Sequence, residues 1–162
     1  ALNLGFGWDR IQNVLWRIDH GEMEGLVPKV VMVLIGTNNL TGTERVRANS
    51  PAEIVEGSLE VGGKILGRSP STRVLILGIL PRDKPGSPMR KAILETNALL
   101  AARVSGRAGF HYLDLTESFT DADGAVPIRL MNDGTHPTEE GYRVWAERLE
   151  PLWHGLGLEG AI

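Results

Sequence analysis

The segment from Met131 to His136 places the carboxylate of Asp133 three residues before the imidazole of His136. In a turn, this spacing lets the carboxylate bind one ring nitrogen, which fixes the tautomer and leaves the other nitrogen free to take a proton. A general base needs this arrangement. Asp and His are also common caps of turns and helices, so the pair alone is equally compatible with a structural role.

A second candidate is Asn38, in the run Gly36-Thr37-Asn38-Asn39 that follows an apolar segment. An Asn at the end of a buried strand can direct its amide N–H at an oxyanion that forms above the sheet. Asn is also a preferred turn residue, and the run by itself favours an ordinary turn.

The third candidate is the glycine-containing stretch from Asn3 to Asp9. It has the pattern of a strand, a turn and a helix start, where free backbone N–H groups suit an anionic oxygen. A tight connection that needs glycine for its backbone angles is the structural alternative.

Short apolar segments rich in β-branched residues predict the strands that would position these groups. Two are apolar on both faces and a third is weaker, while the first residues have the pattern of the end of a fourth. In this order, they are Lys29–Gly36, Arg73–Leu80, Phe110–Leu115 and Ala1–Leu4.

Helices are predicted between these strands. Asp9–Gln12 and Ser50–Glu53 have the pattern of capping boxes, Ser87-Pro88 opens another helix, and a last helix follows Thr138. Apolar residues at helical spacing predict the core-facing sides of the first and last helices. They are Ile11, Val14, Leu15 and Ile18 in the first, and Tyr142, Trp145, Leu149 and Leu152 in the last.

This alternation predicts one α/β domain over residues 1–162, with a three-layer, flavodoxin-like parallel sheet covered by helices on both faces. Ligands bind such sheets at the carboxyl ends of the strands. We therefore expect the chemistry in the loops 36–49, 81–87 and 116–137. Arg82 and Lys84 fall on one of these loops, where a solvated position is the simpler interpretation.

Composition argues against several classes of function. With 17 basic and 20 acidic residues, the net charge of −3 lacks the basic surface of a nucleic-acid binder. No apolar run approaches the roughly 20 residues of a membrane span. We expect no metal site, because Asp121 and Asp123 begin a calcium-loop pattern that Ala125, Val126 and Pro127 cannot complete. The chain has no cysteine, and its compartment stays open.

Taken together, these motifs resemble the SGNH hydrolases, also called GDSL-like esterases. The likeness is strongest to the branch of platelet-activating-factor acetylhydrolase catalytic subunits and related bacterial acetylesterases. It is carried by four stretches: Asn13–Ile18, Gly36–Asn39, Leu77–Arg82, and Arg90 with Asn97. The resemblance implies that His136 is the base, Asp133 its orienting partner, and Asn38 a side-chain donor of the oxyanion hole. It implies a serine ester hydrolase for small acyl esters, most simply acetyl esters of a carbohydrate or another alcohol, without a cofactor and compatible with a homodimer.

The sequence departs from the family pattern at two points. The second glycine of the oxyanion block is replaced by Trp8, so the backbone donor is expected at Gly7 or at Trp8 itself, whose ring would then wall the pocket. No Gly-Asp-Ser block surrounds any of the seven serines, which are Ser50, Ser58, Ser69, Ser71, Ser87, Ser105 and Ser118. We therefore expect the nucleophile on a central strand upstream of residue 1, in a protein truncated here at its N-terminus. The alternative is a non-catalytic SGNH-like binding domain that has lost its nucleophile.

Overall fold

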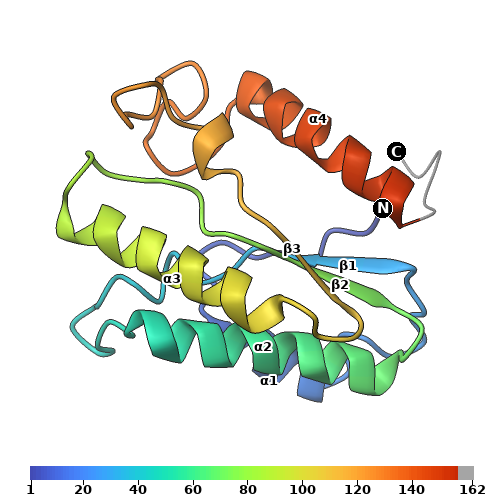
Figure 1. Cartoon of the computed structure of the whole chain (residues 1–162). Coiled ribbons are helices and arrows are strands. Elements are labelled where there is room, and N and C mark those ends of the chain that lie inside the picture. The colour runs from blue at the N-terminus through green and yellow to red at the C-terminus, as the bar shows by residue number, and fades with distance from the viewer. Residues whose placement is uncertain (157–162) are drawn as a thin grey trace.

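A computed structural model describes residues 1–156 and shows a parallel sheet between helices (Figure 1). In chain order the elements are α1 (Ile11–Asp19), β1 (Val30–Val33), α2 (Pro51–Arg68), β2 (Arg73–Leu77), α3 (Pro88–Val104), β3 (Phe110–Leu113), a 3₁₀ turn (Thr116–Ser118) and α4 (Glu139–Gly155).

The three strands pair in parallel in the order β1-β2-β3, with Val31, Val74 and Phe110 in one row. Each strand is followed by a helix before the chain returns to the sheet, so all strands end at the same edge. The predicted parallel α/β architecture is confirmed.

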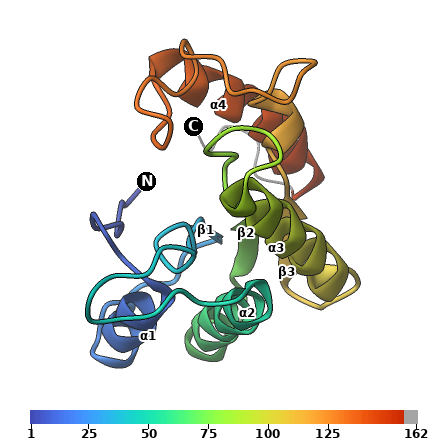
Figure 2. The same cartoon turned by 90° about the vertical axis from the view of Figure 1, so that its left-hand side faces the viewer.

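Strand β2 lies at the centre and serves two cores. Val74 and Ile76 pack with α1, α2 and α3, whereas Leu75 and Leu77 pack with α4. Figure 2 shows α4 on the side of the sheet opposite α1 and α2. Helices therefore cover both faces, as alternation of side chains along a fully buried strand requires.

Three of the predicted helix starts are confirmed. Ser50, Ser87 and Thr138 each accept a hydrogen bond from a backbone N–H in the first turn of α2, α3 and α4. Proline follows the cap in α2 and α3, where its missing N–H is not needed. These local signals fix the points at which the loops return to helices.

The predicted capping box at Asp9 is wrong. Helix α1 begins at Ile11, and the Asn13 side chain accepts the backbone N–H of Arg10 at 3.0 Å. The Asp9 carboxylate is instead bound by both terminal nitrogens of Arg17, at 2.9 and 2.6 Å. A charge-assisted bidentate pair is stronger than a capping bond to a neutral N–H.

The predicted strand at Ala1–Leu4 is absent from the described residues, because no strand lies beside it to complete a ladder. The prediction that β1 is buried on both faces is also wrong, since Met32 is 45% exposed. In α4, Trp145 and Leu149 are buried as predicted, but Tyr142 is 57% exposed and stacks on Trp145 instead of entering the core. Within the described part of the chain, no helix has the length and apolar character for crossing a membrane.

Candidate active site

A cleft of about 140 Å³ opens at the carboxyl ends of the strands. Segments that are distant in the sequence meet there: the stretch before α1, the loop after β1, the loop after β2, and the loop before α4. The lining residues are Phe6, Asp9, Leu34, Ile35, Gly36, Thr37, Asn38, Ile79, Leu80, Arg82 and Thr135.

Asp133 and His136 form a direct pair beside this cleft. The Nδ1 atom of His136 lies 2.7 Å from Oδ2 of Asp133, and Thr135, between them, lines the cleft. The other carboxylate oxygen, Oδ1, accepts the backbone N–H groups of Thr135 and His136, both at 2.8 Å. One carboxylate therefore builds the turn and orients the ring. With Nδ1 protonated toward Asp133, Nε2 is the nitrogen able to accept a proton.

These contacts hold the pKa of the Asp133 carboxyl well below its ordinary value. The largest cause is the backbone N–H of His136, followed by the imidazole of His136 and the backbone N–H of Thr135. Asp133 thus stays ionised at neutral pH. The imidazole is 77% exposed, so a substrate or another segment can reach it.

Asn38 points its amide toward the stretch before α1. Its Nδ2 group donates to the carbonyl oxygen of Asp9 at 3.0 Å. An amide nitrogen carries two hydrogens, so one donor remains for a ligand. Gly36 begins this loop with φ 116°, and a Cβ there would lie 2.8 Å from Ile54. Only glycine fits where β1 turns toward Asn38.

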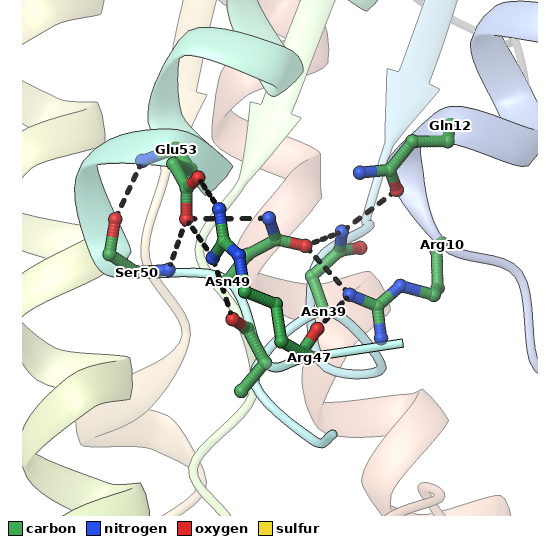
Figure 3. Close-up of polar contacts among 8 residues, drawn as sticks. Arg10, Gln12, Asn39, Arg47, Asn49, Ser50 and Glu53 are labelled. Atoms are coloured by element: carbon green, nitrogen blue, oxygen red, sulfur yellow. Dashed lines mark hydrogen bonds and ion pairs between the residues drawn. The ribbon is translucent and has the colours of Figure 1, made fainter. Parts of the chain in front are cut away.

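A network of polar side chains holds the loop that carries Asn38 (Figure 3). Arg10 donates to the carbonyl oxygens of Asn38, Thr41 and Arg47 at 3.0–3.1 Å and to the side chain of Asn49 at 2.7 Å. Buried Asn39 accepts the backbone N–H of Ile11, and its amide donates to Gln12 and Asn49. The loop is therefore fixed to the start of α1 along much of its length.

The predicted oxyanion turn lies between Phe6 and Asp9, both of which line the cleft. The Asp9 N–H donates weakly to the Phe6 carbonyl at 3.4 Å, and Trp8 has φ 65°. A positive φ at the third residue is the mark of a type II turn and favours glycine there. Trp8 thus adopts a backbone conformation that ordinarily favours glycine. Among the described residues, neither Gly7 nor Trp8 has a partner for its backbone N–H.

The Trp8 side chain is 88% exposed and does not line the cleft, where Phe6 lies instead. Its role as a pocket wall remains a prediction. Arg17 holds this stretch through the Asp9 carboxylate and through its guanidinium, which lies 4.7 Å from the centre of the Phe6 ring. The hydrogen bond to Asp9 is the main cause that raises the pKa of Arg17.

Arg90 and Asn97, singled out by the family likeness, are buried and hold the loop after β2. Asn97 accepts the backbone N–H of Ile79 at 2.8 Å and donates to its carbonyl at 3.0 Å. Arg90 donates to three carbonyl oxygens, those of Arg82, Asp83 and Gly124. Both residues thus fix the backbone of the loop after β2, which forms one wall of the cleft.

Sequence reasoning set Arg82 aside as solvated, yet it lines the cleft. It also missed Phe6, Thr37 and the tethering role of Arg10. Loop position could have indicated Arg82, but the partners of Arg10 are mainly backbone carbonyls that no sequence pattern marks. Over residues 1–156, no group of His, Cys, Asp and Glu is arranged to hold a metal ion.

The family model that describes GDSL-like lipases and acylhydrolases matches residues 1–144. The human platelet-activating factor acetylhydrolase IB subunit alpha1 is 37% identical over 153 residues, which cover 94% of this chain and 63% of that protein. The chain therefore spans less than two thirds of the length of this relative.

Solved structures share the fold. A GDSL-like lipase from Bacteroides thetaiotaomicron superposes with a TM-score of 0.75 at 18% identity, covering 96% of this chain and 73% of its own. An acetyl-xylooligosaccharide esterase from Geobacillus superposes with a TM-score of 0.75 at 14% identity. The superposition covers 98% of this chain and 73% of the esterase. With the family model matching most of its length, this chain belongs to the GDSL-like lipase/acylhydrolase family.

Proposed function

We propose that this domain provides the base and part of the oxyanion hole of a serine ester hydrolase that acts on short acyl esters, most simply acetyl esters of a sugar or another small alcohol. The main support for this proposal is the Asp133–His136 pair beside the cleft that Asn38 lines. Oδ2 of Asp133 and Nδ1 of His136 lie 2.7 Å apart. Family membership and the names of an acetylhydrolase relative and an acetyl-xylooligosaccharide esterase neighbour support acyl chemistry. The small, largely apolar cleft favours a short acyl group.

We further propose that the nucleophile is a serine on a segment that precedes residue 1 in the complete protein and forms a strand beside β1. No serine lines the cleft among residues 1–156. Within residues 1–156, strand β1 pairs only with β2, so its other edge is open to a parallel neighbour, which would also cover the exposed side chain of Met32.

In this mechanism, the serine hydroxyl attacks the ester carbonyl while Nε2 of His136 takes its proton. Asp133 keeps the ring in the required tautomer and stabilises the imidazolium. The amide of Asn38 and a free backbone N–H at Gly7 or Trp8 donate to the oxyanion. His136 then protonates the departing alcohol, and the acyl-enzyme is hydrolysed when His136 deprotonates a water molecule. The resulting carboxylic acid leaves and the serine is regenerated.

The test is steady-state hydrolysis of 4-nitrophenyl acetate by the full-length protein. His136→Ala should abolish turnover above background. Asn38→Ala should lower kcat by about 10²-fold with a small change in KM, because its donor acts mainly on the oxyanion. His20→Ala is the matched control, because this exposed imidazole caps the far end of α1 and stacks on Trp16. Full activity in the His136 variant would refute the assignment, and a wild-type protein without esterase activity would favour the non-catalytic binding domain.

A further inference from the structure

One arginine, Arg82, lines the cleft, and three others bind residues that line it. Arg10 binds the loop after β1, Arg17 binds Asp9 and Glu22, and Arg90 binds three backbone carbonyls. Each holds one segment of the rim. Their guanidinium groups are therefore structural and leave little capacity for a ligand.

Arg82 differs from these three. It lines the cleft, and the contact to the protein is a hydrogen bond from Nη1 to the hydroxyl of Thr37 at 3.2 Å. Within the described part of the chain it forms no salt bridge, and its Nε and Nη2 atoms have no protein acceptor. These nitrogens are not sealed from solvent, since the buried unpartnered atoms are those of Arg10, Ser58 and Trp145.

The backbone that carries Arg82 is held in place. Arg90, 4% exposed, donates from Nε to the carbonyl of Arg82 at 3.1 Å and from Nη2 to that of Asp83 at 2.7 Å. The Asp83 carboxylate accepts the backbone N–H of Lys84 at 2.8 Å. A guanidinium presented from a fixed loop loses less conformational freedom when it binds.

A planar guanidinium with two adjacent free donors matches the two oxygens of a carboxylate or a phosphate. Thr37, whose hydroxyl accepts the hydrogen bond from Arg82, directly precedes Asn38, so this cation lies near the candidate oxyanion donor. The other cleft walls contributed by Phe6, Leu34, Ile79 and Leu80 are apolar and suit an acyl chain. An anionic group of the substrate would therefore belong to its alcohol.

We propose that Arg82 is a specificity-determining residue that binds a carboxylate or phosphate on the alcohol part of the ester. This inference rests on the proposed esterase function and names its substrate class: short acyl esters of anionic alcohols.

The test compares three acetyl esters with similar alkyl alcohols in the full-length protein: neutral 2-acetoxyethanol, 4-acetoxybutanoate and 2-acetoxyethyl phosphate. Acetate release gives kcat/KM for each. Wild type should favour at least one anionic ester over the neutral one by about tenfold or more, as expected for a charge-assisted hydrogen bond. The anionic ester with the larger kcat/KM relative to the neutral ester shows whether the site prefers a carboxylate or a phosphate. Arg82→Gln should remove the preference, and Arg82→Lys should restore part of it.

Lys84→Gln is the matched control. It removes the same charge from the same loop, but Lys84 is exposed and does not line the cleft. Its ratio of anionic to neutral kcat/KM should equal that of wild type. A ratio that is unchanged by Arg82→Gln, or an absence of preference in wild type, would overturn the inference.

A binding measurement separates this inference from the esterase proposal. Titration with 4-hydroxybutanoate and with 2-hydroxyethyl phosphate should shift the side-chain N–H resonance of Arg82 in NMR spectra. If the Arg82 resonance shifts but no ester is hydrolysed, the anion-binding site is supported and the esterase proposal is refuted. Hydrolysis of the neutral ester, with no shift at Arg82 from either anion, would keep the esterase and reject the anion site.

Discussion

Asp133 combines two functions in one side chain. Its Oδ1 atom accepts two backbone N–H groups of the turn, and Oδ2 contacts the imidazole of His136. The contact spans only three residues, and this is why the sequence could predict it. A local turn brings the two groups together whatever the rest of the fold does.

Replacing Asp133 with Asn separates these two functions. The Asn oxygen can still accept the backbone N–H groups, but its amide would then donate to Nδ1 and force the proton onto Nε2. His136 could no longer accept a proton there, so kcat of the full-length protein should fall by about 10³-fold or more. Asp123→Asn makes the same chemical change on the same loop, away from the cleft, and should leave kcat unchanged. A small effect of Asp133→Asn would argue against His136 as the base.

The stability of this turn should depend on pH in a defined direction. Because the folded state lowers the pKa of Asp133, the carboxylate stabilises the native state fully above the ordinary Asp pKa of about 4. That contribution is lost as the pH falls through the lowered pKa. The urea midpoint of wild type should therefore exceed that of Asp133→Asn at pH 7, and the difference should shrink at pH 3. A difference that grows in acid would contradict the assigned contacts.

At the scale of elements, the sequence predicted the features that depend on contacts between nearby residues and missed those that depend on distant partners. Strand β2 and the starts of α2, α3 and α4 follow from apolar runs and caps within a few residues. The strand at Ala1–Leu4 failed because a strand needs a partner, and the capping box at Asp9 failed because Arg17, eight residues away, binds that carboxylate. The tether of the Asn38 loop by Arg10 spans 28–39 residues and left no sequence signal.

Arg10 should control the position of Asn38 without touching substrate. Arg10→Met removes four hydrogen bonds to the loop after β1, so Asn38 should lose its fixed position and kcat should fall about tenfold or more, with a smaller change in KM. Arg10→Lys should recover little, since an ammonium cannot reproduce the planar fork.

Arg45→Met is the control for this experiment, because Arg45 is exposed on the same loop and its side chain has no bond to the start of α1. The Arg10 variant should also be cleaved faster by a protease within residues 41–48. Wild-type kcat together with faster cleavage would show that Arg10 stabilises the loop but does not position Asn38.

At the scale of the whole molecule, the two outer strands of the sheet are not equivalent. In the part of the chain that the structure describes, both β1 and β3 pair only with β2. However, the cleft with the candidate donor Asn38 lies at the end of β1, and the apolar side chains of Phe6 and Leu34 in its wall and of Met32 in β1 are exposed. Such side chains beside an open strand edge favour association or cover by another segment. The proposed nucleophile strand would supply that cover and bring a serine to the free face of His136.

Hydrogen exchange can test this arrangement directly. In the full-length protein, the amide hydrogens of β1 should exchange more slowly than in a chain of residues 1–162, because a parallel neighbour would bind the backbone groups that face away from β2. Residues 2–4 should gain protection as well, since the same strand would give them the partner they lack. Strand β3 is the internal control, and its exchange should be the same in both proteins. Equal exchange at β1 in the two proteins would place the additional segment elsewhere and remove the structural basis for a serine beside His136.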